Sequence, residues 1–357
     1  MSQDVRSRAE RSRELQVQAT AAHIRAKQRA VGLRHAIVIC GFVFAASALL
    51  VVQLFLTGDA HIPANNVIPA ALGQSDGLAD YVVRRTNLPR ALGALLGGAL
   101  FGLSGALAQR LFGNPLATPD IIGISSGAGA GAMIVIAGFG ATGIGVQAGA
   151  LAGALVVALV VYALSWSGGV QSYRLILIGI GVGACASAIV TFIVTRLDEV
   201  STQRAMRWLI GSLNGADARA AALLTVALGV GLVLVLLIRR ALSDLALGDE
   251  LAAGLGIRVS AVRFAALLLA TLLAALVTSV TGPIAFVALV AGPIATRALR
   301  VPDAPIVAAL VGAVLLCATD IAAQTLPLIS PVPTGAITAL FGAPVLIALL
   351  VRRKASV

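Results

Sequence analysis

Long apolar stretches alternate with short polar ones along most of this chain. Each apolar stretch can hold one or two segments of about 20 residues, the length that an α-helix needs to cross a bilayer. The pattern predicts ten spans, at residues 35–57, 90–111, 118–138, 143–165, 174–195, 220–238, 261–282, 284–299, 304–325 and 334–351. We therefore expect an all-α polytopic membrane protein, with span boundaries good to a few residues.

One long polar segment interrupts the apolar pattern in the second half of the chain, between Arg239 and Arg263. Apolar side chains recur in it at roughly helical spacing. They are Leu245, Leu247, Leu251, Leu255 and Ile257. Asp249 and Glu250 face elsewhere, and glycines close the segment. Because the runs on both sides look membrane-spanning, we expect a short helix at the membrane surface, where a soluble partner could bind it.

Composition supports lipid as the solvent of this protein. Hydrophobic residues make up 59% of the chain and charged residues 11%, whereas soluble domains carry about 25% charged residues. The net charge of +11 does not indicate nucleic-acid binding, because the basic residues flank the spans instead of forming one stripe.

Residues that could support chemistry are sparse and scattered. Cys40, Cys185 and Cys317 each stand alone in an apolar run, so we expect no disulfide and no metal site. The three histidines, His23, His35 and His61, form no ligand set. No Walker A sequence is present, so the chain is not expected to bind ATP by that motif. We expect neither a cofactor nor enzymatic activity, since a membrane enzyme would need clustered histidines or acidic residues.

The distribution of basic residues predicts the orientation. Residues 1–34 are rich in arginine, and an even number of spans puts the tail 352–357 on the same side. By the positive-inside rule both tails are cytoplasmic, flanking a transmembrane domain at 35–351 in the cell membrane. No cleavable signal peptide is visible. The segment containing Asp249 is then cytoplasmic too.

Two basic regions fall on the predicted outer side. Arg84, Arg85 and Arg90 end the loop after the first span, and four arginines lie in the loop at 196–219. Either these arginines have no effect on an orientation that the N-terminal tail has already set, or they form a positive outer surface for an acidic protein partner.

The segment Asn114–Pro119 contains two X-Pro pairs that break helical backbone, so Leu116 and Ala117 are expected in a turn at membrane depth. Irregular backbone is tolerated there when it is buried in protein or lines a cavity. The segment is therefore a candidate for the transport pathway, and a plain cytoplasmic turn is the alternative.

The stretch from Asn87 to Ala132, NLPRALGALLGGALFGLSGALAQRLFGNPLATPDIIGISSGAGAGA, resembles the FecCD/BtuC-type permeases of ATP-binding-cassette importers for iron-siderophores, haem and vitamin B12. Five further blocks follow in the family's order, so the resemblance covers almost the whole chain. They are RLILIGIGVG, LALGDELAAGLG, GPIAFVALV, TDIAA and PTGAITALFGAPVLIALL.

The resemblance implies a permease that works by alternating access and makes no covalent chemistry. Two such chains, identical or different, would frame a path between two ATPase subunits and an extracytoplasmic substrate-binding protein. Residues 245–256 would be the coupling helix that docks on the ATPase. Its expected contact residues are Leu247, Gly248, Asp249, Glu250, Leu255 and Gly256.

Gate and docking residues also follow from the resemblance. Leu116 and Ser172 take positions of the inner gate, together with Asn114, Pro115 and Ala117 of the predicted turn. Arg90 matches the second arginine of the family's R-L-P-R motif, which pairs with glutamates of the binding protein. Arg84 and Arg85 are expected to support that docking.

Three positions depart from the family pattern. Asn87 replaces the first arginine of R-L-P-R, and the other outer arginine falls near Gln324. Either Arg84 and Arg85 compensate for these missing charges, or a different second permease chain supplies the contacts. Gly292 and Pro293 replace the usual Pro-His pair. Asp320, by contrast, matches an aspartate of the family pattern; it lies inside an apolar run, either as a structural hydrogen-bond acceptor near a helix end or in a functional role.

Ferric siderophore is the expected cargo, with cobalamin or haem as the alternative. An ion-coupled secondary transporter is a different class, which predicts paired carboxylates within the membrane. Asp320 and Asp120 are the candidates, and neither is paired in the sequence.

Overall fold

The computed structural model describes residues 31–56, 62–166, 172–326 and 332–354, and within them the chain forms helices and no β-strand. The first helix is Val31–Phe55. It is followed by α2 (Ala64–Ala71), α3 (Leu78–Asp80), η2 (Tyr81–Asn87), α4 (Leu88–Phe112), η3 (Pro119–Ile122), α5 (Ile124–Phe139), α6 (Ile144–Ser165), α7 (Ser172–Val194) and α8 (Glu199–Ile210). The remaining helices are α9 (Ala218–Asp244), η4 (Leu245–Leu247), α10 (Asp249–Gly254), α11 (Val259–Thr281), α12 (Val287–Leu299), α13 (Pro305–Thr325) and α14 (Thr334–Lys354).

Among the described residues, seven helices are long and apolar enough to cross a membrane. Three shorter apolar helices, Ile124–Phe139, Val287–Leu299 and Thr334–Ala348, coincide with the three other predicted spans. The all-α, multi-pass membrane class is therefore confirmed. Each predicted span overlaps one helix, while a count of ten membrane crossings stays a prediction.

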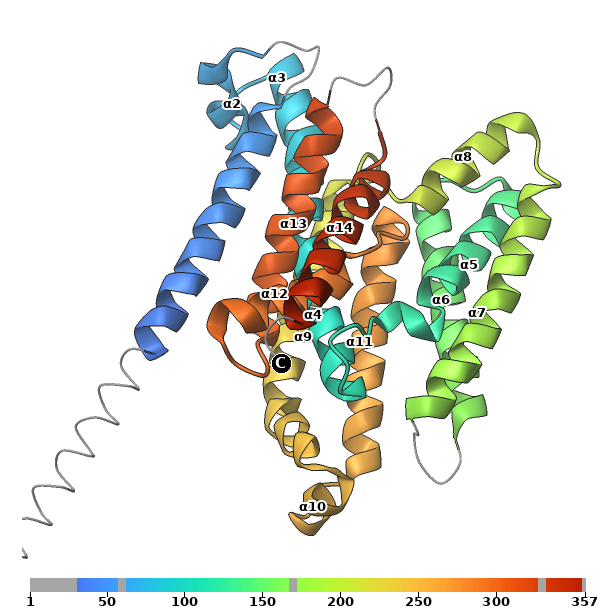
Figure 1. Cartoon of the computed structure of the whole chain (residues 1–357). Helices are drawn as coiled ribbons and strands as arrows, with labels where there is room; N and C mark the ends of the chain where they lie inside the picture. Colours follow the sequence, from blue (N-terminus) through green and yellow to red (C-terminus); the bar gives the residue numbers. More distant parts are fainter. Residues whose placement is uncertain (1–30, 57–61, 167–171, 327–331, 355–357) are drawn as a thin grey trace, which may run out of the picture.

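Helix α4 is the centre of the main bundle, which also contains the first helix, α9 and α11–α14 (Figure 1). It is buried along most of its length, and its small residues let the neighbouring backbones come close. A Cβ atom at Gly98 would overlap the carbonyl oxygen of Gly312 in α13, and one at Gly105 would overlap that of Ala288 in α12. The many glycines of this segment thus determine how closely the bundle packs.

A second, smaller bundle is formed by α5, α6 and α7, and it has its own apolar core (Figure 1). Gly131 and Gly153 bring α5 and α6 into backbone contact in the same way as the glycines of α4. Helix α11 packs against both bundles and so joins them. Small residues thus form the close helix–helix contacts of both bundles.

The helical boundaries differ from the predicted ones at several places. The polar residues before the second span are helical, because η2 is a π-helical segment that runs directly into α4. The predicted loop at 196–219 contains α8, which Asp198 caps by accepting a hydrogen bond from the Ser201 N–H. Helix α14 extends through the first residues of the predicted tail 352–357, to Lys354. Most of the predicted tail 1–34 lies outside the described residues.

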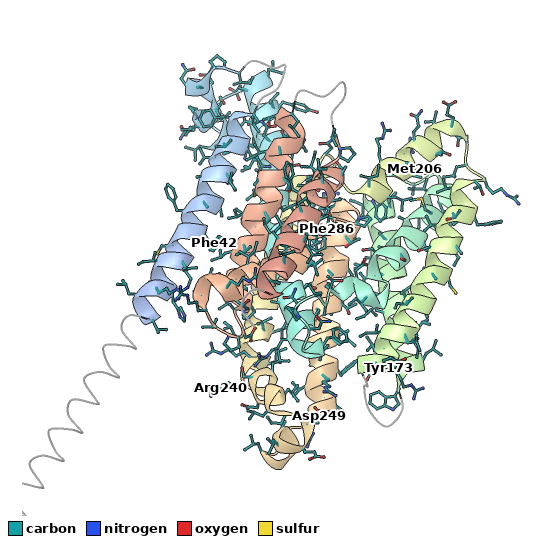
Figure 2. All side chains as sticks on the ribbon, in the orientation of Figure 1. Phe42, Tyr173, Met206, Arg240, Asp249 and Phe286 are labelled. Carbon is teal, nitrogen blue, oxygen red and sulfur yellow. The ribbon has the colours of Figure 1, made fainter. Side chains whose placement is uncertain are left out.

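Two ends of the molecule can be distinguished. One end, here named the α8 end, contains α2, α3 and α8, and the opposite end, the α10 end, contains α10 (Figure 1). All side chains are drawn in Figure 2, where Met206 marks the α8 end and Asp249 the α10 end.

Candidate translocation and coupling sites

The segment predicted as the coupling helix is folded as two short pieces at the α10 end. Helical turn η4 ends at Leu247, Gly248 adopts φ 100°, and α10 starts at Asp249. The positive φ of Gly248 is the reason that one continuous helix does not form, since an L side chain rarely adopts it. The predicted single helix at 245–256 is therefore divided at Gly248.

Three of the five apolar side chains of this segment are exposed, whereas Leu245 and Ile257 are partly buried and Leu245 packs against the core. Leu247, Leu251 and Leu255 are 57%, 63% and 65% exposed, whereas Ala252 on the opposite side is fully buried. Leu251 and Leu255 are four residues apart, one helical turn, and Leu247 precedes them across the division at Gly248. This exposed leucine row is a surface suited to binding another protein.

Asp249 is paired within the chain. The Arg263 guanidinium of α11 donates a hydrogen bond of 2.9 Å to the Asp249 carboxylate. Both side chains are partly exposed, at 24% for Arg263 and 51% for Asp249. The pair connects α10 to α11, and Glu250 beside it is exposed.

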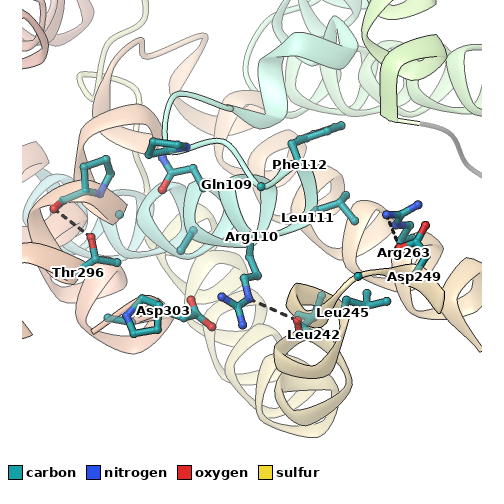
Figure 3. Close-up of a pocket in the computed structure, with 18 residues that line it drawn as sticks. Gln109, Arg110, Leu111, Phe112, Leu242, Leu245, Asp249, Arg263, Thr296 and Asp303 are labelled. Carbon is teal, nitrogen blue, oxygen red and sulfur yellow. Dashed lines mark hydrogen bonds and ion pairs between the residues drawn. The ribbon is translucent and has the colours of Figure 1, made fainter. Parts of the chain in front are cut away.

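A cavity of about 500 Å³ opens at the same end of the molecule, between α4, α9, α11 and α12 (Figure 3). The Arg110 guanidinium crosses it and donates to the carbonyl oxygens of Leu242 and Ser243, both at 3.4 Å. Asp303 also lines the cavity, on the side of Arg110 that faces away from Leu242 (Figure 3). Burial raises the pKa of the Asp303 carboxyl, and the nearby Arg110 charge and the Ala304 N–H oppose that rise.

The departure at Gly292-Pro293 has a structural reason in this cavity. Pro293 has no N–H, so the carbonyl of Leu289, four residues earlier in α12, loses its helical partner. The Gln109 side-chain amide of α4 donates to that carbonyl at 3.0 Å. A Cβ atom at position 292 would overlap the Gln109 Oε1 atom. Glycine at 292 therefore makes room for the side chain that replaces the missing hydrogen bond.

The predicted turn at Asn114–Pro119 is irregular backbone, as expected. Helix α4 ends at Gly113, and the Asn114 side-chain oxygen accepts the Leu116 N–H at 2.9 Å. Leu116 is 38% exposed and Ala117 is buried. Pro115 borders the cavity at the α10 end.

A second cavity, of about 520 Å³, lies beyond this turn. It is bordered by η3, α5, α8, α11, α12 and α14, and Thr118 and Pro119 form part of its wall. Phe286 contributes to the wall with φ 69°, a strained value for an aromatic residue. Its Cβ atom lies so close to Gly342 of α14 that a side chain there would collide with it. Strained residues of this kind often lie at functional sites.

Ser172 is the first residue of α7, and its side chain lies outside the described part of the chain. The next residue, Tyr173, lies at the lower end of the second bundle in Figure 2, toward the α10 end. The gate roles of Ser172 and of the turn at Asn114–Ala117 stay predictions.

The arginines of η2 and of the first turn of α4 fall into two groups. Arg84 and Arg85 are mostly exposed, at 57% and 72%, and each has an oxygen of Asp80 within 4 Å, at 3.7 Å and 3.9 Å. Arg90, at the start of α4, points into the bundle instead, and its side chain is 19% exposed. Its guanidinium donates two hydrogen bonds to Asp320, at 2.8 Å and 2.9 Å. The sequence did not indicate this pair, because the two residues are far apart along the chain.

Both positions where the family's outer arginines are replaced hold inward-facing amides. Asn87 donates to the carbonyl of Leu56, at 3.0 Å, just after the end of the first helix. Gln324 donates to the Asp320 carboxylate at 2.9 Å. Each amide therefore makes its contact within this chain.

Comparisons with known proteins agree with these features. The FecCD transport family model matches residues 42–352. The chain is 34% identical over 323 residues to the ferric enterobactin transport system permease protein FepG of Escherichia coli (strain K12), covering 90% of this chain and 98% of the relative. It is 38% identical over 291 residues to the achromobactin transport system permease protein CbrC of Dickeya dadantii (strain 3937), covering 79% of this chain and 81% of the relative.

A cobalamin relative and a solved structure extend the comparison. The cobalamin import system permease protein BtuC of Halobacterium salinarum (strain ATCC 700922 / JCM 11081 / NRC-1) is 37% identical over 284 residues, covering 77% of this chain and 75% of the relative. A solved inward-facing structure of a putative metal-chelate type ABC transporter superposes with a TM-score of 0.75 at 26% identity, over 87% of this chain and 98% of its own. This chain therefore belongs to the FecCD transport family.

Proposed function

We propose that this chain is the membrane-spanning permease subunit of an ATP-binding-cassette importer of ferric siderophores, driven by a separate ATPase through alternating access. The observation that carries the proposal is the match to a ferric enterobactin permease over 90% of the chain. In this proposal the helices cross the cell membrane ten times, with both termini and the α10 end in the cytoplasm and the α8 end outside.

The exposed leucine row of Leu247, Leu251 and Leu255 supports docking of the ATPase at α10. A Cβ atom added at Gly248 or Gly256 would meet no other atom within 4 Å, so open space for a partner surface surrounds both glycines. Replacing Asp249 and Glu250 together with lysine should abolish co-purification of the ATPase. The exposed Glu199 of α8 provides the control, since Glu199→Lys changes a charge at the opposite end. Retained co-purification in the double variant would reject this docking site.

The cavity between α5, α8, α12 and α14 is the best candidate for this chain's part of the transport path. Its walls are mostly small and neutral, which suits a bulky chelate that is not selected by charge. The irregular turn at Asn114–Pro119 lies between this cavity and the one at the α10 end, since Pro115 borders one and Thr118 the other. That position supports the proposed inner gate.

Docking of a substrate-binding protein is proposed at the α8 end. Exposed arginines lie there on η2 and α8: Arg84, Arg85, Arg204 and Arg207. Such a surface suits acidic groups on a partner. Reversing Arg84 and Arg85 to glutamate should weaken docking at low salt, while Arg240→Glu at the α10 end should not. Arg90 needs a separate test, because reversing it also breaks its pair with Asp320.

A second permease chain is proposed to complete the path. Helix α14 exposes Leu340, Phe341 and Ile347 at 63%, 51% and 61%, which leaves an apolar face available for that chain. Because Asn87 and Gln324 face inward at the positions where the family resemblance leads us to expect arginines, we favour a non-identical second chain that supplies those charges. Purification of one tagged chain with an untagged copy would show whether identical chains pair.

Uptake of an iron-labelled siderophore by a deletion strain, with and without this chain, tests the cargo. Energy-dependent uptake restored by the chain is expected for a ferric siderophore, whereas restored uptake of cobalamin or haem would support the alternative cargo. Transport driven by an ion gradient alone would overturn the proposal. Asp320, one of the two carboxylates that the ion-coupled alternative would use, is instead bound by Arg90 within this chain.

A further inference from the structure

Asp320 is the most highly coordinated polar group among the described residues. Its side chain is fully buried, and it accepts five hydrogen bonds from four residues. Two come from Arg90, and the others come from Gln53 at 2.7 Å, Gln324 at 2.9 Å and Thr334 at 2.6 Å. A buried carboxylate is costly unless it is paired and its lone pairs are satisfied, and here both conditions hold.

These donors come from different helices. Gln53 belongs to the first helix, Arg90 to α4 and Gln324 to α13, which also carries Asp320. Thr334 is the first residue of α14. Of the five bonds, the one from Thr334 alone reaches α14.

The start of α14 is also held from its other side. The Gly335 N–H donates to the Gly211 carbonyl, just after α8, at 3.0 Å. A Cβ atom at Gly335 would overlap the carbonyl oxygen of Ile210. The first turn of α14 is therefore seated between the Asp320 carboxylate and the backbone at the end of α8.

That same turn forms a wall of the proposed transport path. Gly335, Ala336 and Ala339 border the cavity that also contains Phe286. A shift of the start of α14 would therefore change the width of the cavity.

We propose that Thr334 and Asp320 are positioning residues for transport: the Thr334–Asp320 hydrogen bond sets the position of the α14 wall of the cavity. Arg90 balances the charge of the Asp320 carboxylate and helps to hold it in place. The hydrogen bond from the Thr334 hydroxyl then fixes the start of α14 relative to that carboxylate. The bond can be removed without breaking the ion pair, so the position of α14 and the stability of the bundle are separable. The functional importance of this wall rests on the proposed function, but its position can be measured without cargo.

The test measures the reactivity of a reporter cysteine, Ala336→Cys, toward a small methanethiosulfonate in isolated membranes, where the reagent reaches both faces. Ala336 is exposed and borders the cavity. The exposed Cys40 and Cys185 are replaced by serine, and buried Cys317 is kept. The chain without the reporter gives the background rate.

Thr334→Val, which removes the hydroxyl and keeps the shape, should raise the reporter's modification rate about three- to tenfold, since a hydrogen bond to a charged group is lost. Thr334→Ser should restore the rate. Gln324→Met is the matched control, because it also removes one neutral donor from Asp320 but leaves α14 untouched. Thr338→Val controls for the loss of a buried hydroxyl in α14 itself, whose bond is to Gly335 in its own helix.

An unchanged rate in Thr334→Val would overturn the proposal. So would an equal rise in Gln324→Met or Thr338→Val, which would mean general loosening of the bundle. Thr334→Ala takes the place of Thr334→Val if that variant is not recovered in the membrane. Failure of the wild-type chain to support siderophore uptake would reject the proposed function and leave the labelling result unaffected, so the two failures can be told apart.

Discussion

The two ends of this protein each contain an aspartate–arginine pair, with similar hydrogen-bond lengths and opposite surroundings. At the α8 end, Asp320 is fully buried and its Arg90 partner is 19% exposed. At the α10 end, Asp249 is 51% exposed and Arg263 is 24% exposed. The closest contact is 2.8 Å in the first pair and 2.9 Å in the second.

The difference shows that distance alone does not determine the role of an ion pair. Around Asp320, neutral donors from other helices complete the carboxylate's hydrogen bonds, so removing one partner leaves a buried charge. Around Asp249, water can replace the partner at little cost. The first pair is suited to fixing helices, and the second is suited to exchange with a docking protein.

The largest expected effect is at the buried pair. Arg90→Met should lower the free energy of unfolding by about 3–5 kcal/mol, because Asp320 stays buried without a counter-charge. The double variant Arg90→Met with Asp320→Leu should recover part of that loss, because the buried charge is gone while Gln53 and Thr334 lose their acceptor. Denaturant unfolding in detergent micelles measures both. A loss of less than about 1 kcal/mol in the single variant would contradict the assignment of Arg90 as a structural cation.

An intermediate effect is expected in the cavity at the α10 end, where packing and hydrogen bonding act together. Gly292→Ala should cost about 1–3 kcal/mol, because the added methyl group overlaps the Gln109 side chain. Combining it with Gln109→Ala should cost less than the sum of the two single changes. Gly254→Ala in α10, where a Cβ meets no atom within 4 Å, is the control. Simple additivity would show that the two positions do not interact.

A smaller effect on stability is expected at the exposed pair. Arg263→Gln should change the free energy of unfolding by less than about 1 kcal/mol. It should nevertheless weaken stimulation of ATP hydrolysis by cargo, because α10 loses its contact with α11. Unfolding and ATPase measurements on the same complex test both parts. If Arg263→Gln destabilises as strongly as Arg90→Met, burial is not what distinguishes the two pairs.

The smallest effect concerns the pH dependence at Asp303. Because burial raises the pKa of this carboxyl in the folded protein, the unfolded chain loses its proton first as pH rises. Ionised Asp303 therefore lowers stability above its folded pKa. Asp303→Asn should raise the unfolding temperature at pH 7, and the gain should vanish at a pH below the ordinary aspartate pKa. A gain independent of pH would have another cause.

Much of the fold followed from the one-dimensional pattern. Each apolar run overlaps a helix, because a segment in lipid must satisfy its backbone hydrogen bonds internally. The break at Asn114-Pro115 could also be found, since proline acts on its own helical turn, whereas α12 continues through Pro293 without a break. The π-helical segment at Tyr81–Asn87 and the division of the coupling segment at Gly248 were missed, although the second had a local signal, since glycine readily adopts a positive φ.

The candidate site residues also divide into features that the sequence predicted and features that it did not. The sequence identified Asp249, Arg90 and Asp320 as charges worth explaining, but it did not indicate which residues pair with one another. A buried aspartate inside an apolar run was the one signal that a cation had to lie nearby, and nothing along the chain indicated that Arg90 would be that cation.

The sequence by itself determined that this protein is a helical, multi-pass membrane protein of the FecCD transport family, because hydrophobic length and local motifs are properties of neighbouring residues. The tertiary structure decided which charges are buried, which leucines face outward and which helix each carboxylate holds. Those properties depend on contacts between residues far apart in the chain, as in the pair of Arg90 and Asp320.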